Sequence, residues 1–322
     1  MMRVSTDVFV VGAGGAGMYA AISAAREGAD VIVADKSLIS RGGATIMAQM
    51  TVASAVGHEE PDHWTHHLAD TIEAGHSLCN DELSAILCEE SVTRIHEMDE
   101  WKVGWAKVDG RMTQVHAPGH GLKRCVYVDY LNTGPAVARA LRGEVAQRAG
   151  IRRASGLAVI EIVIQDGEAV GAVGIDVESG EIVLVEAGAV ILAAGGLTKL
   201  YKRNSASINM GGEAFSLALH AGAELIDMEF VQFFPIGHLA PRMVGMDPIM
   251  WDPFRYKVGG RLLNGNFEEF IHNYGASDSG TYTARRDVAS YAIYKEVEEG
   301  RGSPHGGVWL SFDHISEDVM KE

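Results

Sequence analysis

The stretch Asp7-Val8-Phe9-Val10-Val11-Gly12-Ala13-Gly14-Gly15-Ala16-Gly17 joins an apolar strand to a glycine-rich turn. Helical character follows over residues 18–26, and residues 30–35 return to strand character and end on Asp35. In a βαβ unit of this kind, the first glycine permits the tight turn and the second lets the backbone approach a pyrophosphate. The third lets the helix pack closely on the strand. The stretch therefore predicts an α/β fold that starts with a βαβ unit.

The same turn carries groups that suit a nucleotide. The helix start offers free N–H groups and the positive end of the helix dipole to phosphates. Asp35 can accept hydrogen bonds from a ribose diol. A GxGxxG pattern alone is a weak signal, because a tight turn that binds nothing also contains glycines. Here strand, turn, helix, strand and terminal acid occur in order, so we predict a dinucleotide site.

Composition excludes several classes of protein. The 322 residues are 47% hydrophobic and 22% charged, which is typical of a globular chain of about two domains. A net charge of −16 argues against nucleic acid as a partner. We see no secretory signal and no apolar run near the roughly 20 residues of a membrane span. Cys79, Cys88 and Cys125 lack a cluster spacing, so we expect reduced thiols in a cytoplasmic protein without an iron–sulfur cluster.

Periodicity outlines the rest of the chain. After the nucleotide unit, helical spacing occurs in the segments 63–73, 81–99, 135–149, 213–221 and 286–299. An irregular loop is expected over 116–134. A small antiparallel meander is predicted from strand-like segments at 158–164, 169–176 and 182–186. A separate, fully buried strand is expected over 189–196. His63, His66 and His67 lack an evident third ligand, so we expect a solvated helix face and no metal site.

The order of motifs resembles a known family of flavoproteins. Four features follow one another: the βαβ unit, the meander, Ala193-Ala194-Gly195-Gly196, and Met228-Glu229-Phe230-Val231-Gln232-Phe233. This order is similar to the flavoprotein subunits of succinate dehydrogenase and fumarate reductase, whose relatives include L-aspartate oxidase and adenylylsulfate reductase. The resemblance covers essentially the whole chain, and it implies FAD as the cofactor.

The resemblance also implies which residues contact FAD. The strand that ends in two glycines packs beside the flavin nucleotide, where glycine allows a close backbone approach. The membrane-bound relatives carry Ser-His-Thr, with the His bonded to FAD, whereas this chain has Arg41-Gly42-Gly43-Ala44-Thr45, so we expect noncovalent FAD. The predicted cofactor residues are Gly12, Gly14, Gly15, Ala16, Gly17, Asp35, Lys36, Arg41, Gly42, Gly43, Ala44, Thr45, Ala158, Ala193, Ala194, Gly195, Gly196 and Glu213.

A second domain is implied by the same resemblance. In the family, an α+β capping domain is inserted after Phe-His-Pro-Thr-Gly and closes over the flavin. Here that motif reads Phe233-Phe234-Pro235-Ile236-Gly237, with Phe at the substrate-binding His and Ile at the Thr. We expect an FAD-binding domain over 1–238 and an incomplete capping domain over 239–322. Because relatives are longer, the chain looks like an N-terminal portion, a split subunit or a truncated form with weak activity alone.

Candidate catalytic residues come from the family's proton path, which runs through Thr-Glu-x-x-Arg and a later Arg-Asp segment. Asp252, Arg255 and Arg286 match this path, with Asp for Glu, and Arg286 would be the general acid. His120 resembles the family's Gly-His loop and is expected to line the pocket. A salt-bridge cluster at a helix start explains Arg286 equally well, and a turn explains Asp252 before Pro253.

These features predict an FAD-dependent oxidoreductase. It would transfer a hydride between flavin N5 and a C=C or CH–CH bond of a small carboxylate, with Phe234 arguing against plain fumarate. An iron–sulfur subunit would exchange electrons with it, and the chain could dock on a membrane complex. Two alternatives stay open: an enzyme similar to L-aspartate oxidase or adenylylsulfate reductase, and a flavin-binding electron-transfer subunit without its own substrate site.

Overall fold

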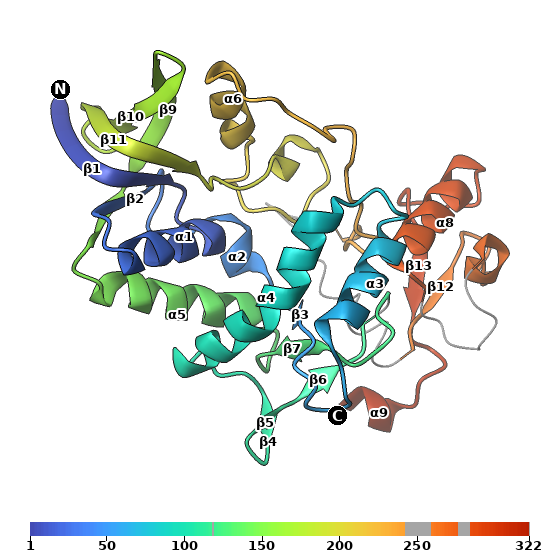
Figure 1. The fold of residues 1–322 in the computed structure, drawn as a ribbon. Helices are drawn as coiled ribbons and strands as arrows, with labels where there is room; N and C mark the ends of the chain where they lie inside the picture. The colour runs from blue at the N-terminus through green and yellow to red at the C-terminus, as the bar shows by residue number, and fades with distance from the viewer. Residues whose placement is uncertain (118, 242–258, 276–283, 322) are drawn as a thin grey trace. The chain divides into compact units, whose positions relative to one another are not determined.

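The computed structural model describes residues 1–117, 119–241, 259–275 and 284–321 (Figure 1). The chain forms two compact units, and each is described by itself. The first unit consists of Met1–His116, Gly121–Lys202 and Ala206–Asp227. The second consists of Ala117–His120, Arg203–Ser205 and Met228–Glu322.

A six-stranded sheet forms the centre of the first unit. Its strand order is β8 (Ile151–Ser155), β2 (Val31–Asp35), β1 (Met2–Val11), β11 (Ile182–Leu192), β10 (Glu168–Asp176) and β9 (Leu157–Gln165). The first four strands are parallel, and β11, β10 and β9 are antiparallel neighbours. The predicted α/β class, with a parallel nucleotide unit and a small meander, is confirmed.

Alternation along β1 explains the two hydrophobic cores of this unit, because successive side chains of a strand point to opposite faces. Val10 packs in one buried cluster with Met18, Ile22 and Leu141. These residues come from α1 (Gly15–Arg26) and α5 (Thr133–Gln147), which Figure 1 shows on one side of β1 and β2. Phe9 and Val11 pack in the other cluster with residues from the meander, among them Leu157, Ile162, Ala172 and Val185.

Shorter elements complete the first unit. The helices are α2 (Gly43–Met47), α3 (Trp64–Ala74), α4 (Asp81–Glu100), α6 (Glu213–His220) and the 3-10 helix η1 (Thr198–Leu200). A three-stranded sheet has the order β3 (Thr51–Ala53), β7 (Cys125–Tyr127), β6 (Gln114–Val115). A two-stranded ribbon pairs β4 (Lys107–Val108) with β5 (Arg111–Met112).

Two expectations about strands were wrong. The segments 182–186 and 189–196 were expected to be separate strands, yet β11 is continuous because it pairs in parallel with β1 from Met2↔Val183 to Val11↔Leu192. The end of β11 is only partly buried, since β10 pairs with its first half alone. The loop expected over 116–134 contains β7, which pairs with β3 and β6 on either side.

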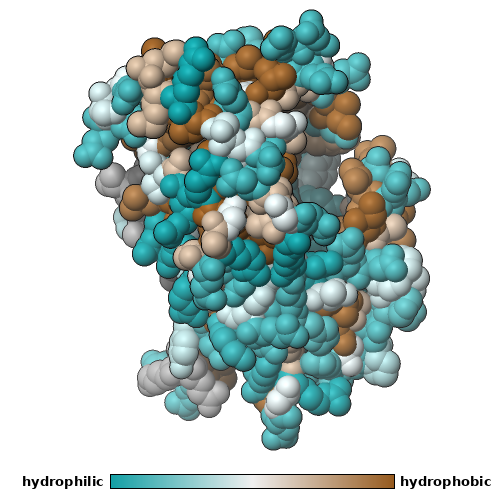
Figure 2. Space-filling view, turned by 60° about the vertical axis from the view of Figure 1, so that its left-hand side comes forward, coloured by the Kyte–Doolittle hydropathy of each residue, from teal (hydrophilic) through white to brown (hydrophobic). Residues whose placement is uncertain are grey.

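The outer surface of the meander carries some apolar side chains. Figure 2 views the protein from the side of β1 and β9–β11, and brown patches lie among teal ones near the top, where the meander and α6 are. Ile160, Ile164 and Ile182 are among the exposed residues of these strands. Apolar residues scattered in this way are common on protein surfaces.

The second unit is a smaller α+β structure. A two-stranded antiparallel sheet joins β12 (Arg261–Leu263) to β13 (Trp309–Ser311). The helices are α8 (Arg286–Glu298), α9 (Glu317–Lys321) and the 3-10 helix η2 (Ile271–Tyr274). Its core contains Ile236, Leu262, Phe270, Ile271, Ala284, Ala289 and Ala292.

Candidate functional site

The glycine turn lies where the carboxyl ends of three parallel strands meet. Gly12 N donates to Ala34 O of β2 at 2.8 Å, and Ala193 N donates to Val11 O of β1 at 2.8 Å. Gly12 has a φ of +104°, and a Cβ added to it would lie 2.4 Å from Ala193 O. Only glycine fits there, because the turn and the end of β11 are in direct backbone contact.

The other glycines of the turn separate into two kinds. A Cβ on Gly17 would lie 1.8 Å from Gly12 O, so this residue is required by the packing of the turn itself. A Cβ on Gly14 would meet Thr45 Oγ1 at 3.7 Å as its nearest neighbour among the described residues, which is an ordinary contact. The fold does not demand a glycine at position 14, and the open space there suits a ligand that approaches the backbone.

The start of α1 is arranged for an anion. Gly14 is the N-cap residue and has no side chain with which to cap the helix. Gly15 N donates to Thr45 Oγ1 at 2.8 Å. The first N–H groups of a helix have no partner within the helix, and the helix dipole is positive there, so phosphate oxygens bind well. This is the arrangement that a dinucleotide pyrophosphate requires.

Asp35 lies at the end of β2, beside the turn. Its Oδ2 accepts from Ala13 N at 3.0 Å, and its Oδ1 accepts from Ser37 N and Ser37 Oγ, each at 2.8 Å. An ionised carboxylate has about four acceptor positions, so Asp35 can hold the turn and still accept from a ribose hydroxyl. The predicted neighbours Gly12, Ala13 and Asp35 are therefore brought together.

The segment after β2 folds back over the turn. Ser40 N donates to Ala13 O at 3.1 Å, and the following residues start α2, which carries Thr45. A Cβ on Gly42 would lie 2.0 Å from Asn209 Nδ2, and Gly43 N donates to Ser207 Oγ at 3.2 Å. The segment 207–209 thus closes one side of the candidate site.

Three polar residues near the turn were missed by sequence reasoning. Asn209 Nδ2 donates to Ser37 Oγ at 2.9 Å, which links two loops 172 residues apart in the chain. Ser207 completes the set through its bond from Gly43. No local motif marks these residues, since the spacing reflects only how the loops meet in space.

Lys36 and Glu213, both predicted to contact the cofactor, form an ion pair with each other. Burial raises the pKa of Glu213, but the Lys36 ammonium and backbone N–H groups at the start of α6 lower it more. The net pKa lies below the ordinary value, so Glu213 stays ionised at neutral pH. The pair fastens the end of β2 to the start of α6.

The remaining predicted cofactor residues lie near the same strand ends. Ala158 is in β9, opposite Ile175, just after a corner where Gly156 N donates to Ser37 O at 3.0 Å. Ala193, Ala194 and Gly196 are half-buried beyond the end of β11, and Gly195 is exposed with a φ of +79°. Ala16 and Arg41 are exposed, and Ala44 is half-buried in α2.

Comparison with known proteins identifies the group to which this chain is related. A family model described as "FAD binding domain" matches residues 7–322.

This chain belongs to the FAD-binding family.

Relatives of this FAD-binding chain have names that agree with its motifs. A fumarate reductase (CoM/CoB) flavoprotein relative from Methanothermobacter marburgensis is 33% identical, over 98% of this chain and 57% of the relative. The fumarate reductase flavoprotein subunit of Escherichia coli K12 is 29% identical, over 100% of this chain and 54% of its own length. A solved structure of a mutant E. coli quinol fumarate reductase matches with a TM-score of 0.91 at 27% identity, over 100% of this chain and 56% of that one.

The resemblance to the fumarate reductase and succinate dehydrogenase flavoprotein subunits is confirmed, and so is FAD as the cofactor. The FAD-binding chain spans little more than half the length of the relatives named above. Adenylylsulfate reductase from Archaeoglobus fulgidus shares the fold, with a TM-score of 0.72 at 20% identity. Within the described ranges, no helix is both long and apolar enough to cross a membrane.

The predicted catalytic residues of the FAD-binding chain lie in the second unit or outside the described residues. Asp252 and Arg255 fall outside them. Arg286 is the first residue of α8, half-buried, with its guanidinium carbon 4.8 Å from the centroid of the Phe234 ring. His120 is half-buried in a turn where its N–H donates to Ala117 O at 3.1 Å.

The residues that replace the family's His and Thr have different environments. Phe234 contacts Arg286, as described. Ile236 is 7% exposed and packs in the core of the second unit, so its substitution for Thr fills the interior and does not line a pocket. His238, close in sequence to the replaced His, has Nε2 2.9 Å from Pro241 O.

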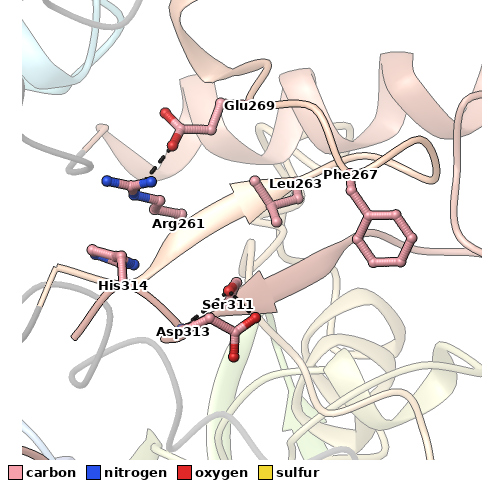
Figure 3. Close-up of a pocket in the computed structure, with 7 residues that line it drawn as sticks. All are labelled: Arg261, Leu263, Phe267, Glu269, Ser311, Asp313 and His314. Carbon is pink, nitrogen blue, oxygen red and sulfur yellow. Dashed lines mark hydrogen bonds and ion pairs between the residues drawn. The ribbon is translucent and has the colours of Figure 1, made fainter. Parts of the chain in front are cut away.

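A cavity of about 390 Å³ also lies in the second unit, on the ribbon of β12 and β13 (Figure 3). Arg261 forms an ion pair with Glu269 at 3.1 Å, and Phe267 points away from this pair at the other end of the view. The complete lining is Arg261, Leu263, Phe267, Glu269, Ser311, Asp313 and His314. None of the predicted catalytic residues that the structure describes is in this lining.

Proposed function

We propose that this chain is the FAD-binding part of an oxidoreductase that reduces or forms a C=C bond in a carboxylate substrate other than plain fumarate. The observation that carries the proposal is the contrast between the glycines, since position 14 leaves room that packing does not require. When bound, FAD supplies a hydride donor or acceptor. Because no histidine occurs in 40–45, we propose that FAD is held noncovalently.

The residues of the chain would share the work as follows. The N–H groups at the start of α1 would bind the pyrophosphate, and Asp35 would hold the ribose. Arg286 would pass a proton to the substrate carbon, and its place at a half-buried helix start beside an aromatic ring supports this role. Asp252 and Arg255 would return the proton to Arg286, and His120 would line the pocket.

The partners stay proposals. We propose that the substrate is a small carboxylate and that the electron partner is an iron–sulfur subunit, in a cytoplasmic protein that can dock on a membrane complex. The names of the relatives support the electron partner, since several are subunits of larger enzymes. Phe234 at the substrate-binding position equally favours an enzyme similar to L-aspartate oxidase or adenylylsulfate reductase, or an electron-transfer subunit without a substrate site.

Two alanine variants test the cofactor site. Gly14→Ala fills the open space without a clash, so we expect its unfolding midpoint within about 2 °C of wild type and an FAD affinity at least about tenfold weaker. Gly17→Ala overlaps Gly12 O, so it should cost about 1–3 kcal/mol of stability as well as FAD binding. Calorimetric FAD titration and thermal unfolding measure both quantities.

Gly143→Ala is the matched control. Gly143 is in α5, and a Cβ there meets nothing within 4 Å among the described residues, so FAD affinity should not change. If Gly14→Ala bound FAD as tightly as wild type, the cofactor would not approach the backbone at the turn and the proposal would be wrong.

A further inference from the structure

One face of α8 fastens the segment 233–236 of the second unit. Arg286 and Ser290 are four residues apart, so they lie on the same face of the helix. The Arg286 guanidinium carbon is 4.8 Å from the Phe234 ring centroid, and Ser290 Oγ donates to Phe233 O at 2.9 Å. Ile236 anchors the far end of the segment in the core. The ring of Phe234 is therefore held in place against Arg286.

This contact determines which atoms of Arg286 remain available. A cation is attracted to the face of an aromatic ring, and the ring then covers part of the guanidinium. The N–H groups of a guanidinium lie in its plane and form a fork that fits a carboxylate. Phe234 thus restricts the orientation of this fork, and its own side chain offers no hydrogen bond to a ligand.

A substrate that reaches Arg286 meets a donor on one side and a hydrocarbon ring beside it. A second carboxylate placed against the ring of Phe234 would lose its water and gain no partner there, which is costly. An apolar group at the same place would pack on the ring. Sites discriminate strongly when one candidate leaves a buried polar group unpaired.

We propose that Phe234 is a positioning and specificity-determining residue, which orients Arg286 and selects an α,β-unsaturated monocarboxylate with an apolar far end over a dicarboxylate. This inference rests on the proposed function, because it assumes that Arg286 faces the substrate. It goes further by naming the substrate class and the side chain that selects it.

The positioning role is tested by NMR of arginine side chains in the ¹⁵N-labelled chain. An aromatic ring shifts the Nε–Hε signal of a guanidinium above it, and Arg286→Lys identifies that signal by removing it. We expect Phe234→Leu to abolish the ring shift and Phe234→Tyr to retain it. Phe267→Leu, a matched change at a ring that stacks on Trp309, should leave the signal in place. An unshifted Arg286 signal in Phe234→Leu relative to wild type would overturn the positioning role.

The specificity role is tested with crotonate and fumarate, which differ by a methyl group in place of one carboxylate. Binding is followed in the FAD-loaded chain by flavin absorbance and by the Arg286 signal. We expect wild type to bind crotonate at least about tenfold more tightly, and Phe234→His to shift the ratio toward fumarate by about tenfold or more. Phe234→Leu should weaken crotonate binding by about two- to fivefold, because Arg286 loses its support.

The outcomes separate the two proposals. Carboxylate binding with the same crotonate-to-fumarate ratio in wild type and Phe234→His would overturn the inference and leave the proposed function standing. Absence of binding of both acids in wild type and in Phe234→His would overturn the specificity role together with the proposed function.

Discussion

Glu296 is expected to make the second unit sensitive to acid. Its carboxylate lies on α8 and is 2% exposed. It accepts from Arg301 Nε at 2.9 Å and Nη2 at 2.8 Å, from Tyr274 OH at 2.7 Å and from Asn264 Nδ2 at 3.0 Å. The Arg301 hydrogen bonds lower the pKa of Glu296 most, burial opposes them, and Tyr274 and Asn264 lower it further, to about 2.

The magnitude follows from proton linkage. Folding lowers this pKa from 4.5 to about 2, so the stabilisation is complete above pH 4.5 and is lost as the pH falls toward 2. At about 1.4 kcal/mol per pKa unit, the contribution is about 3 kcal/mol. Because Arg301 is 37% exposed and solvent screens its charge, this value is an upper limit.

Hydrogen exchange over 261–274 and 286–301 measures the effect. After correction for the intrinsic exchange rate at each pH, wild type should lose up to about 3 kcal/mol of opening free energy between pH 5 and pH 2. Glu296→Gln has no titrating carboxylate, so its curve should be less stable at pH 7 and nearly flat over the same interval. Glu268→Gln, at an exposed carboxylate 3.2 Å from Asn264 Nδ2, is the control and should follow wild type. Parallel curves for wild type and Glu296→Gln would refute the reasoning.

Two further predictions concern the cofactor site. Thr45→Val removes the acceptor for Gly15 N, so it should lower the free energy of unfolding by about 1 kcal/mol and weaken FAD binding, while Thr45→Ser keeps both; equal thermal midpoints for Thr45→Val and wild type would contradict this. Acid precipitation of the FAD-loaded chain should leave all flavin in the supernatant, because 40–45 contain no histidine, and a yellow pellet would reveal a covalent bond.

Local motifs made the nucleotide unit predictable. The roles of Gly12, Gly17 and Asp35 depend on residues within one βαβ unit, so the spacing of the glycines and the terminal acid contains the necessary information. The class of fold and the cofactor followed from that unit and from the order of the later motifs. The contact of Gly42 with Asn209 was not predictable, because it depends on how two distant loops meet.

Strand boundaries failed for a related reason. The alternation of β11 reads as two strands, since Gly188 interrupts it, but pairing with β1 continues across the interruption. The role of Ile236 also escaped sequence reasoning. A substitution within a binding motif was read as a change of the pocket wall, whereas the side chain packs in the core beneath it. Whether a residue faces a ligand or the interior depends on tertiary packing, which a short motif does not encode.

The hydroxyl of Thr45 has a consequence for how the holoprotein is made. Helix α1 begins at a glycine and would fray at its first turn without an acceptor, yet Gly15 N already has one from α2. That acceptor is backed by α5, where Gly134 N donates to Ala48 O at 2.7 Å just after α2. The chain supplies its own stand-in for the first contact of the nucleotide, which allows the βαβ unit to fold on leaving the ribosome and receive its flavin later.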